Sequence, residues 1–291
     1  MKWLRQAKAS LMLNIIQNIF RIEELRQRIF FTLAMLFIFR LGAHIPTPGI
    51  DGAALTAFFD AQQGSILRFF DMFTGGALAR LTVFALGVMP YISASIIIQL
   101  LTAVFPYLER LSKEGDAGRK KITSYTRYGT IVLSVVQGFA IAVGLESMAA
   151  PNGQPIVIST LSPWAFRALT VITLTAGTAF LMWVGEQISE RGIGNGISLL
   201  IFAGIVVGIP GAIINSVRLV QDNVLSPLVL AVVGILMIVV VFLVIFAETA
   251  YRKIPVQYAK RMQGNRMSGG QSSHLPLKIN PAGVIPPIFA S

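Results

Sequence analysis

The chain alternates long apolar stretches with shorter segments that carry most of its charged residues. An α-helix needs about 20 predominantly apolar residues to cross the hydrocarbon core of a bilayer. Stretches of this kind occupy residues 81–105, 128–150, 164–184, 197–214 and 225–247. A further stretch, residues 29–45, is shorter and contains Arg40 and His44, but its run of apolar side chains is unfavourable in water. The pattern therefore predicts six transmembrane helices.

Two apolar segments do not fit this set of spans. Residues 46–80 are too apolar for a solvated loop, and a short helix is predicted over residues 65–73, before Gly75 and Gly76. Backbone that enters a membrane only partway persists where protein or water surrounds it. Two interpretations stay open, a cap packed on the outer face and a short helix folded back into a cavity.

The other such segment is the end of the chain. Residues 281–291 begin a new apolar run that contains three prolines and is too short to span a bilayer. We therefore expect the chain to stop inside a structural element. At the other end, polar residues interrupt the apolar stretch 11–20, and no small-residue cleavage site follows it, so residues 1–28 do not read as a cleavable signal. They predict a cytoplasmic segment with an amphipathic helix on the membrane surface.

Composition and charge settle the class of protein and its orientation. Hydrophobic residues make up 54% of the 291 residues and charged residues only 13%, whereas soluble domains carry about 25% charged residues. A soluble globule is therefore excluded. The net charge is +11, and most of the 24 Lys and Arg residues fall on one side of the predicted spans. Positive residues favour the cytoplasmic side, which places the N-terminus there.

Candidate catalytic chemistry is absent from the sequence. The chain has no cysteine, its two histidines lie in different segments, and no zinc-protease or serine-hydrolase motif occurs. The glycine-rich residues 192–196 lack the lysine of a phosphate-binding loop and predict a tight turn into the next span. We expect no cofactor, no metal and no enzymatic activity.

Ionisable residues within the predicted spans cluster at span ends. Arg40, Glu146, Arg167, Glu186 and Glu248 are the candidates, and snorkelling or pairing explains residues in such positions. An ion-coupled transporter of small solutes would place a charge near the midplane. A secondary transporter with inverted repeats remains the alternative function, and an intramembrane enzyme is a distant third.

Two segments carry a resemblance to a known family. Residues 86–100, LGVMPYISASIIIQL, and residues 182–198, MWVGEQISERGIGNGIS, resemble signature segments of the SecY family, the channel subunits of the bacterial protein translocase. The resemblance implies an all-α polytopic membrane protein, a SecY-type inverted-repeat helical bundle. Residues 29–218 would be the first half, with five helices. Residues 219–291 would hold the sixth complete transmembrane helix, a docking loop and the start of a seventh.

The resemblance also implies a set of site residues that lie along the pore. From periodicity alone, ordinary core or lipid-facing aliphatics are the favoured interpretation of these positions. The family's apolar pore ring falls on Val88, Ile92, Ile197, Ile201 and Ile288. The plug falls on residues 65–73, with Ile66, Leu67, Phe69, Phe70, Met72 and Phe73 as its apolar side chains and Gly75 and Gly76 as its hinge. A polar cluster at the lateral gate falls on Ser93, Gln137 and Asn280.

The partners implied by the resemblance bind outside the pore. Residues 251–273 resemble the cytoplasmic loop that receives the motor ATPase SecA and the ribosome, with Lys260, Arg261 and Arg266 as contacts; topology-setting charges without a partner are the alternative. SecE and SecG are the expected companion subunits. The implied function is to move unfolded polypeptides with signal sequences across the bacterial plasma membrane and to release membrane helices into lipid.

Overall fold

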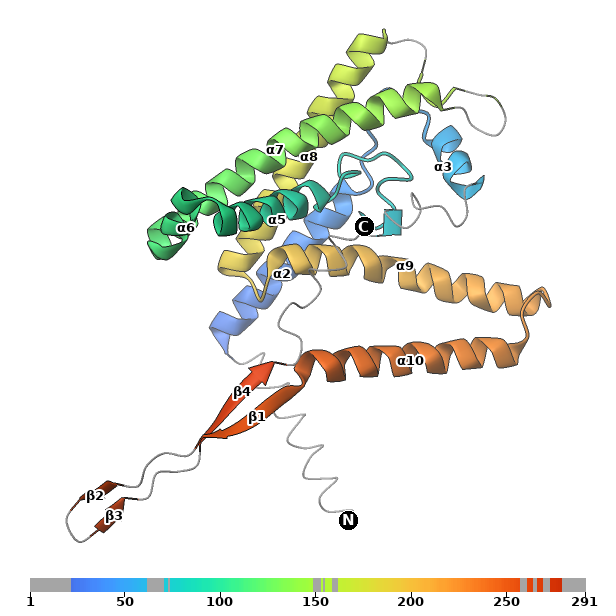
Figure 1. Cartoon of the computed structure of the whole chain (residues 1–291). Helices are drawn as coiled ribbons and strands as arrows, with labels where there is room; N and C mark the ends of the chain where they lie inside the picture. The colour runs from blue at the N-terminus through green and yellow to red at the C-terminus, as the bar shows by residue number, and fades with distance from the viewer. Residues whose placement is uncertain are drawn as a thin grey trace. The chain divides into compact units, whose positions relative to one another are not determined.

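The computed structural model describes residues 22–61, 71–72, 74–148, 153, 155–158, 162–256, 261–263, 266–268 and 273–278 (Figure 1). The chain forms two compact units, Met1–Ala212 and Ile213–Ser291. The boundary falls inside a helix, α9, and each unit is described by itself below. The surface helix expected near the N-terminus lies outside the described residues.

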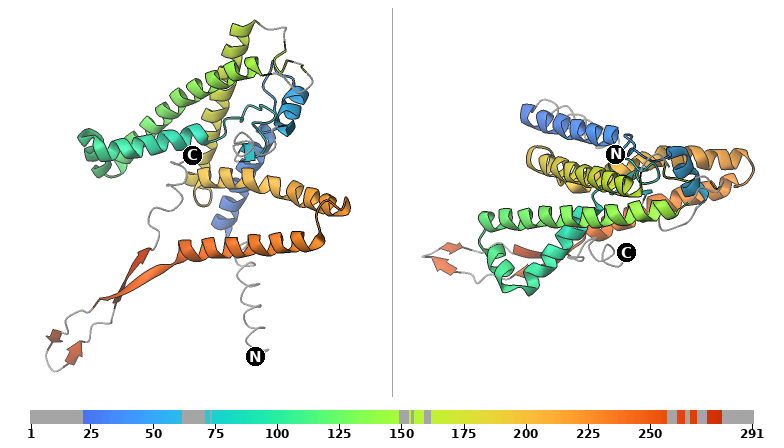
Figure 2. Two further views of the ribbon diagram at one scale, coloured as in Figure 1. Left: turned by 45° about the vertical axis from the view of Figure 1, so that its right-hand side comes forward. Right: turned by 90° about the horizontal axis from the view of Figure 1, so that it is seen from above.

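Unit 1 is a bundle of helices with an irregular segment inside it. Its elements are α2 (Glu23–Gly42), α3 (Gly52–Ala61), α5 (Met89–Val104), α6 (Pro106–Lys113), α7 (Asp116–Ser147), α8 (Pro163–Arg191) and the first part of α9 (Gly196–Gln221). Helix α7 packs along α8, and α5 packs along α7 (Figures 1 and 2). Helix α2 packs against α8 on another side.

Local sequence signals explain where the long helices begin. Ser162 caps α8 by accepting a hydrogen bond from the Ala165 N–H, at 3.4 Å, and Pro163 occupies its first turn. Ser226 caps α10 (Pro227–Thr249) in the same way. A serine cap satisfies an N–H that the helix leaves unpaired, and proline is favoured in the first turn because it has no N–H to lose.

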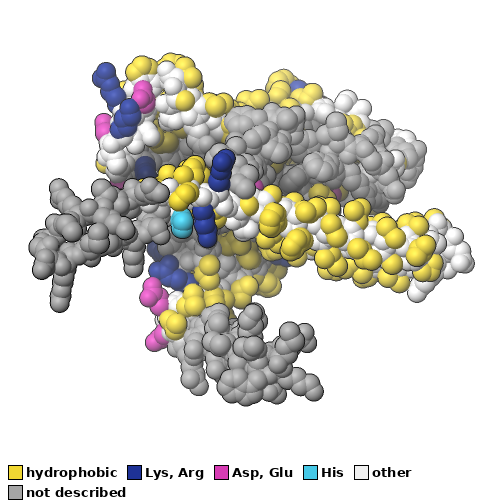
Figure 3. All heavy atoms as spheres, turned by 60° about the horizontal axis from the view of Figure 1, so that its bottom comes forward, with side chains coloured by type: hydrophobic (Ala, Val, Ile, Leu, Met, Phe, Trp, Pro, Cys, Tyr) yellow, Lys and Arg dark blue, Asp and Glu magenta, His cyan; other side chains and the backbone are white. Residues whose placement is uncertain are grey.

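Unit 2 holds the rest of α9, helix α10 and four short strands. Helix α10 has no buried residue and exposes many large apolar side chains, and apolar side chains are visible along the face turned to the viewer in Figure 3. This suits a helix surrounded by lipid or other apolar helices. The strands are β1 (Tyr251–Val256), β2 (Arg261–Gln263), β3 (Arg266–Ser268) and β4 (Ser273–Lys278). β1 pairs antiparallel with β4, and β2 pairs antiparallel with β3. The helical prediction is confirmed for the chain, but this strand pairing was not expected.

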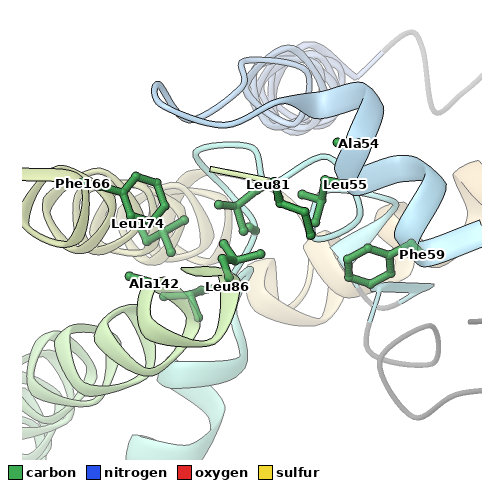
Figure 4. Packing of buried hydrophobic residues seen from close by; sticks show 11 residues of the cluster. Ala54, Leu55, Phe59, Leu81, Leu86, Ala142, Phe166 and Leu174 are labelled. Carbon is green, nitrogen blue, oxygen red and sulfur yellow. The ribbon is translucent and has the colours of Figure 1, made fainter. Parts of the chain in front are cut away.

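One apolar cluster of unit 1 lies where α7 ends and α8 begins. Leu55 of α3, Leu81 and the α8 residues Phe166 and Leu174 are at most 1% exposed in it (Figure 4). Backbone hydrogen bonds join Asp51 and Gly49 to residues 156 and 158, which lie between α7 and α8. Residues 49–61 are therefore packed over this end of the helices. Most of the predicted short helix, residues 65–70 and 73, lies outside the described residues.

The number of spans differs from the prediction. Within the described residues, four helices are long and apolar enough to cross a membrane, namely α7, α8, α9 and α10, or five if α5 and α6 count as one broken span. Helix α2 falls short because Arg26, Arg28 and Arg40 lie within it. The predicted span 81–105 is wrong in its first third, because residues 81–88 form turns and α5 has only 16 residues.

Candidate functional site

The irregular residues 81–88 lie between α2 and α8 because two glycines allow a close approach. A Cβ added at Gly177 of α8 would overlap the carbonyl oxygen of Val83, and one added at Gly42 of α2 would overlap the ring of Phe84. The Val83 N–H also donates to the Ile45 carbonyl oxygen, at 3.0 Å. This segment is therefore wedged inside the bundle, and it ends at Val88, the N-cap of α5.

The start of α9 is positioned by close packing on α8. A Cβ added at Gly196 would overlap the carbonyl oxygen of Gly185, and a Cβ added at Gly185 would overlap the Cδ1 atom of Ile197. The Ser189 hydroxyl oxygen accepts a hydrogen bond from the Gly196 N–H, at 2.9 Å. The glycine-rich turn before Gly196 is confirmed, and its role is to let α9 leave α8 at short range.

These two arrangements bring the described members of the predicted ring into one apolar cluster. Val88 is 7% exposed, and Ile92, Ile197 and Ile201 are partly buried against the same cluster. Its buried members on α8 and α9 are Leu181, Val184, Ile188 and Leu200. Ile288 lies outside the described residues. The cluster is aliphatic and aromatic throughout, so it offers no group for catalysis and acts chemically only by excluding water.

The predicted hinge residues lie in a turn that touches α9. Gly75 and Gly76 have φ values of 69° and 82°, a region that glycine adopts without a steric penalty. An added Cβ on Gly75 would be 3.1 Å from the Cα of Gly204, whereas one on Gly76 would meet nothing within 4 Å. Of the predicted plug side chains, only that of Met72 is described, and it is 46% exposed; Ile66, Leu67, Phe69, Phe70 and Phe73 lie outside the described residues.

The predicted gate residues lie on two helices that pack together. Ser93 is on α5 and Gln137 is on α7, and both are partly buried. The structure records no hydrogen bond between these two side chains. Asn280 lies outside the described residues, so the polar cluster is represented by two of its three members.

Three of the five charged residues expected at span ends, Glu146, Arg167 and Glu186, take part in ion pairs between helices. Arg127 of α7 and Glu186 of α8 are joined at 2.7 Å. Arg167 of α8 donates hydrogen bonds to the carboxylate of Glu146 of α7 from its Nε and Nη2 atoms, the shortest contact being 2.6 Å. Arg40 donates a hydrogen bond to the Gly75 carbonyl oxygen, at 3.3 Å. Pairing was one of the two explanations expected for these residues, and here it joins α7 to α8 near each end.

The predicted docking segment is an antiparallel hairpin. Arg261 and Arg266 lie on β2 and β3, where Arg266 is paired with Gln263 and Arg261 with Ser268. Lys260 lies outside the described residues. The basic residues of β1 and β4 belong to the same hairpin and are exposed; they are Arg252, Lys253 and Lys278. The sequence predicted all three on the cytoplasmic side, and Arg252 and Lys253 within the docking segment, but did not name any of them as a docking contact.

Outside the hairpin, charged residues between α5 and α7 lie on the short helix α6. Lys113 of α6 contacts Glu109 one turn away, at 2.6 Å, and this hydrogen bond and charge hold the pKa of Glu109 below its usual value. No group of three or more metal-ligating side chains occurs among the residues that the structure describes.

Comparison with known proteins identifies the family of this chain. The sequence model of the SecY family matches residues 82–291. The protein translocase subunit SecY of Escherichia coli K12 is 54% identical over 268 residues, which are 92% of this chain and 60% of that protein. The chain belongs to the SecY family. SecY of Vibrio cholerae is 51% identical over 270 residues, covering 93% of this chain and 60% of its own length. The chain thus spans about 60% of the length of these two SecY proteins.

Solved structures support the SecY fold. A structure titled as that of a protein conducting channel aligns with a TM-score of 0.59 at 22% identity, covering 91% of this chain and 55% of that one. Sec61 from a canine ribosome-channel complex aligns with a TM-score of 0.54 at 22% identity, covering 79% of this chain and 49% of that one. At this identity the likeness establishes the fold. The protein is accordingly a multi-pass membrane protein of SecY type.

Proposed function

We propose that this chain forms the central pore of a protein-conducting channel. It moves unfolded secretory polypeptides across the bacterial plasma membrane and releases the helices of membrane proteins laterally into lipid. The observation that carries this proposal is the convergence of Val88 and Ile92 with Ile197 and Ile201 on one apolar cluster. The two pairs come from segments far apart in the chain and are presented by different helices.

An aliphatic constriction suits such a pore for a physical reason. A narrow apolar ring stays dry, and a dry ring blocks ions because an ion that enters it loses its hydration. The same side chains offer no hydrogen bonds that a passing polypeptide would have to break. Ile288 completes this part of the ring in the proposal, and residues 65–73 act as a plug that moves aside when a polypeptide enters.

The lateral gate is proposed to open along α5. Ser93 of α5 and Gln137 of α7, with Asn280, would hold the gate shut through hydrogen bonds. Such bonds contribute on average about 0.6 kcal/mol each within a membrane. A gate held by a few of these bonds closes reversibly, because a signal sequence or an apolar helix can displace them.

The partners are proposed from the charge of the hairpin and from the family. SecA and the ribosome would dock on β1–β4 through Lys260, Arg261 and Arg266, because Arg and Lys side chains bind both acidic protein surfaces and RNA phosphates. The similar Sec61 structure is titled as part of a ribosome-channel complex. SecE and SecG would complete the channel, and the N-terminus would face the cytoplasm. The work of transport would come from SecA or from the ribosome, with no chemistry performed by this chain.

The proposed ring is tested by measuring how substitutions at its residues change the resting ion conductance of the channel. Ile92→Gly or Ile197→Gly, placed in translocase assembled from the full-length protein, should raise the resting ion conductance in planar bilayers without substrate. Ile97→Gly is the matched control, because Ile97 lies on the same helix and is 46% exposed. Background conductance in the ring variants, or equal leak in the control, would contradict the proposal.

A further inference from the structure

The turn that follows the proposed plug is held by one carboxylate side chain and its own carbonyl group. The Oδ1 atom of Asp71 accepts a hydrogen bond from the Ala79 N–H, at 2.8 Å. The Asp71 carbonyl oxygen accepts from the Gly76 N–H and from the Thr74 hydroxyl, both at 3.0 Å. Asp71 therefore ties three positions of the following turn to itself.

Other bonds close the same turn from within. The Thr74 hydroxyl oxygen accepts a hydrogen bond from the Leu78 N–H, at 3.3 Å, and Thr74 is 6% exposed. Ala77 is fully buried in the apolar cluster that contains Val88 and Leu200. A turn whose polar groups are satisfied and whose apolar residue is buried has little freedom to flex.

Two neighbouring helices fix this turn in place. Arg40 of α2 donates to the Gly75 carbonyl oxygen, and the Gly75 backbone lies against the Gly204 backbone of α9, where a Cβ would be 3.1 Å from Gly204 Cα. The turn is thus anchored on α2 and α9, next to the start of α9 that presents Ile197 and Ile201.

We propose that residues 74–79, together with Asp71 and Met72, form a fixed anchor rather than a hinge, so that within the proposed plug only the residues before Asp71 move. Asp71 is the positioning residue that keeps this anchor rigid. The inference rests on the proposed channel function, because an anchor matters only if the segment before it must return to one place. The positive φ values of Gly75 and Gly76 then serve close packing and a tight turn. Movement of the segment before Asp71 leaves this turn where it is.

The test compares two changes at Asp71 in the assembled translocase. Asp71→Ala removes the acceptor of the Ala79 N–H, whereas Asp71→Asn retains an Oδ1 acceptor. Loss of one such bond should raise the resting ion conductance about fivefold, because a typical hydrogen bond shifts an equilibrium by about that factor. Asp71→Asn should stay near wild type. Amide exchange over residues 76–79 should rise in Asp71→Ala alone, which reports the turn directly.

A second pair of variants separates an anchor from a hinge. Gly75→Ala and Gly76→Ala impose a similar strain at positive φ, but only the Gly75 side chain would meet the α9 backbone. An anchor predicts a larger leak for Gly75→Ala, and a free hinge predicts equal effects. Ile92→Gly is the control for the channel itself. If Ile92→Gly leaks while Asp71→Ala does not, or if the two glycine variants behave alike, the anchor is refuted and the channel stands. If Ile92→Gly also fails to leak, the proposed function is refuted and the anchor with it.

Discussion

Gly177 offers the sharpest test of how residues 81–88 are held between α2 and α8. In α8 its missing side chain makes room for the carbonyl oxygen of Val83, and the Cβ of an alanine would also lie 2.9 Å from Val83 Cγ1. Backbone cannot rotate out of the way as a flexible side chain does, so Gly177→Ala must push residues 81–88 and α8 apart.

The expected magnitude follows from two opposing terms. Overpacking a well-packed interior costs about 1–3 kcal/mol, and replacing a helical glycine with alanine gains about 1 kcal/mol in helix propensity. We expect Gly177→Ala to lower the stability by about 1–2 kcal/mol, since the obstructing atom is backbone. Gly144→Ala in α7 is the matched control, because nothing lies within 4 Å of the added Cβ. That variant should be neutral or stabilised by up to about 1 kcal/mol.

Thermal unfolding of the purified translocase checks both variants. A change of 1 kcal/mol moves the melting temperature by about 2–4 °C in proteins of this size, so the two variants should differ by several degrees. Gly177→Ala should also raise the resting ion conductance, since the displaced segment carries Val88. Equal melting temperatures for the two alanine variants would show that α8 and residues 81–88 do not approach as closely as the structure has them.

Two further predictions concern charged residues. Glu186→Gln should lower the melting temperature of the translocase by removing the partner of Arg127, and the exchanged pair, Arg127→Glu with Glu186→Arg, should recover part of the loss; no recovery would mean that the ion pair does not join α7 to α8. Reversing the charges of Lys260, Arg261 and Arg266 should weaken binding of SecA or ribosomes to the translocase, measured by co-sedimentation, while its membrane insertion is unchanged; undiminished binding would remove the docking role from these residues.

Helix existence could be predicted from hydropathy, but helix ends could not. The apolar run 128–150 corresponds to α7, which begins at Asp116 instead. Hydropathy reports the part of a helix that lies in lipid, and α7 continues for about three turns through charged residues that no apolar pattern marks. The hairpin β1–β4 was missed for a similar reason, because the side chains described on β1 and β4 form no buried face that a sequence pattern would mark.

The irregular segment 81–88 shows a different failure. Its apolar residues read as the start of a span, yet its burial comes from packing between α2 and α8 rather than from lipid. Hydropathy cannot tell these environments apart, since both exclude water. A signal was present in Gly87 and Pro90. Gly87 has a φ of 57°, and Pro90 lies in the first turn of α5, so the two residues mark the place where the helix begins.

The proposed ring residues are harder still to recognise from physical chemistry. Val88 is 7% exposed, close to Phe39 and Phe84 in the same cluster at 6% and 5%, so burial does not separate a ring residue from a core residue. A proposed ring residue differs from a core residue in which structural elements hold it and its neighbours. Val88 is held by a segment wedged against α2 and α8, while Ile197 is held by α9 at its junction with α8. A core cluster needs only to fill space, but a seal needs faces on separately anchored elements, because those elements must part when a polypeptide enters. Aliphatic side chains suit that interface since their contacts are non-directional and re-form without a fixed partner.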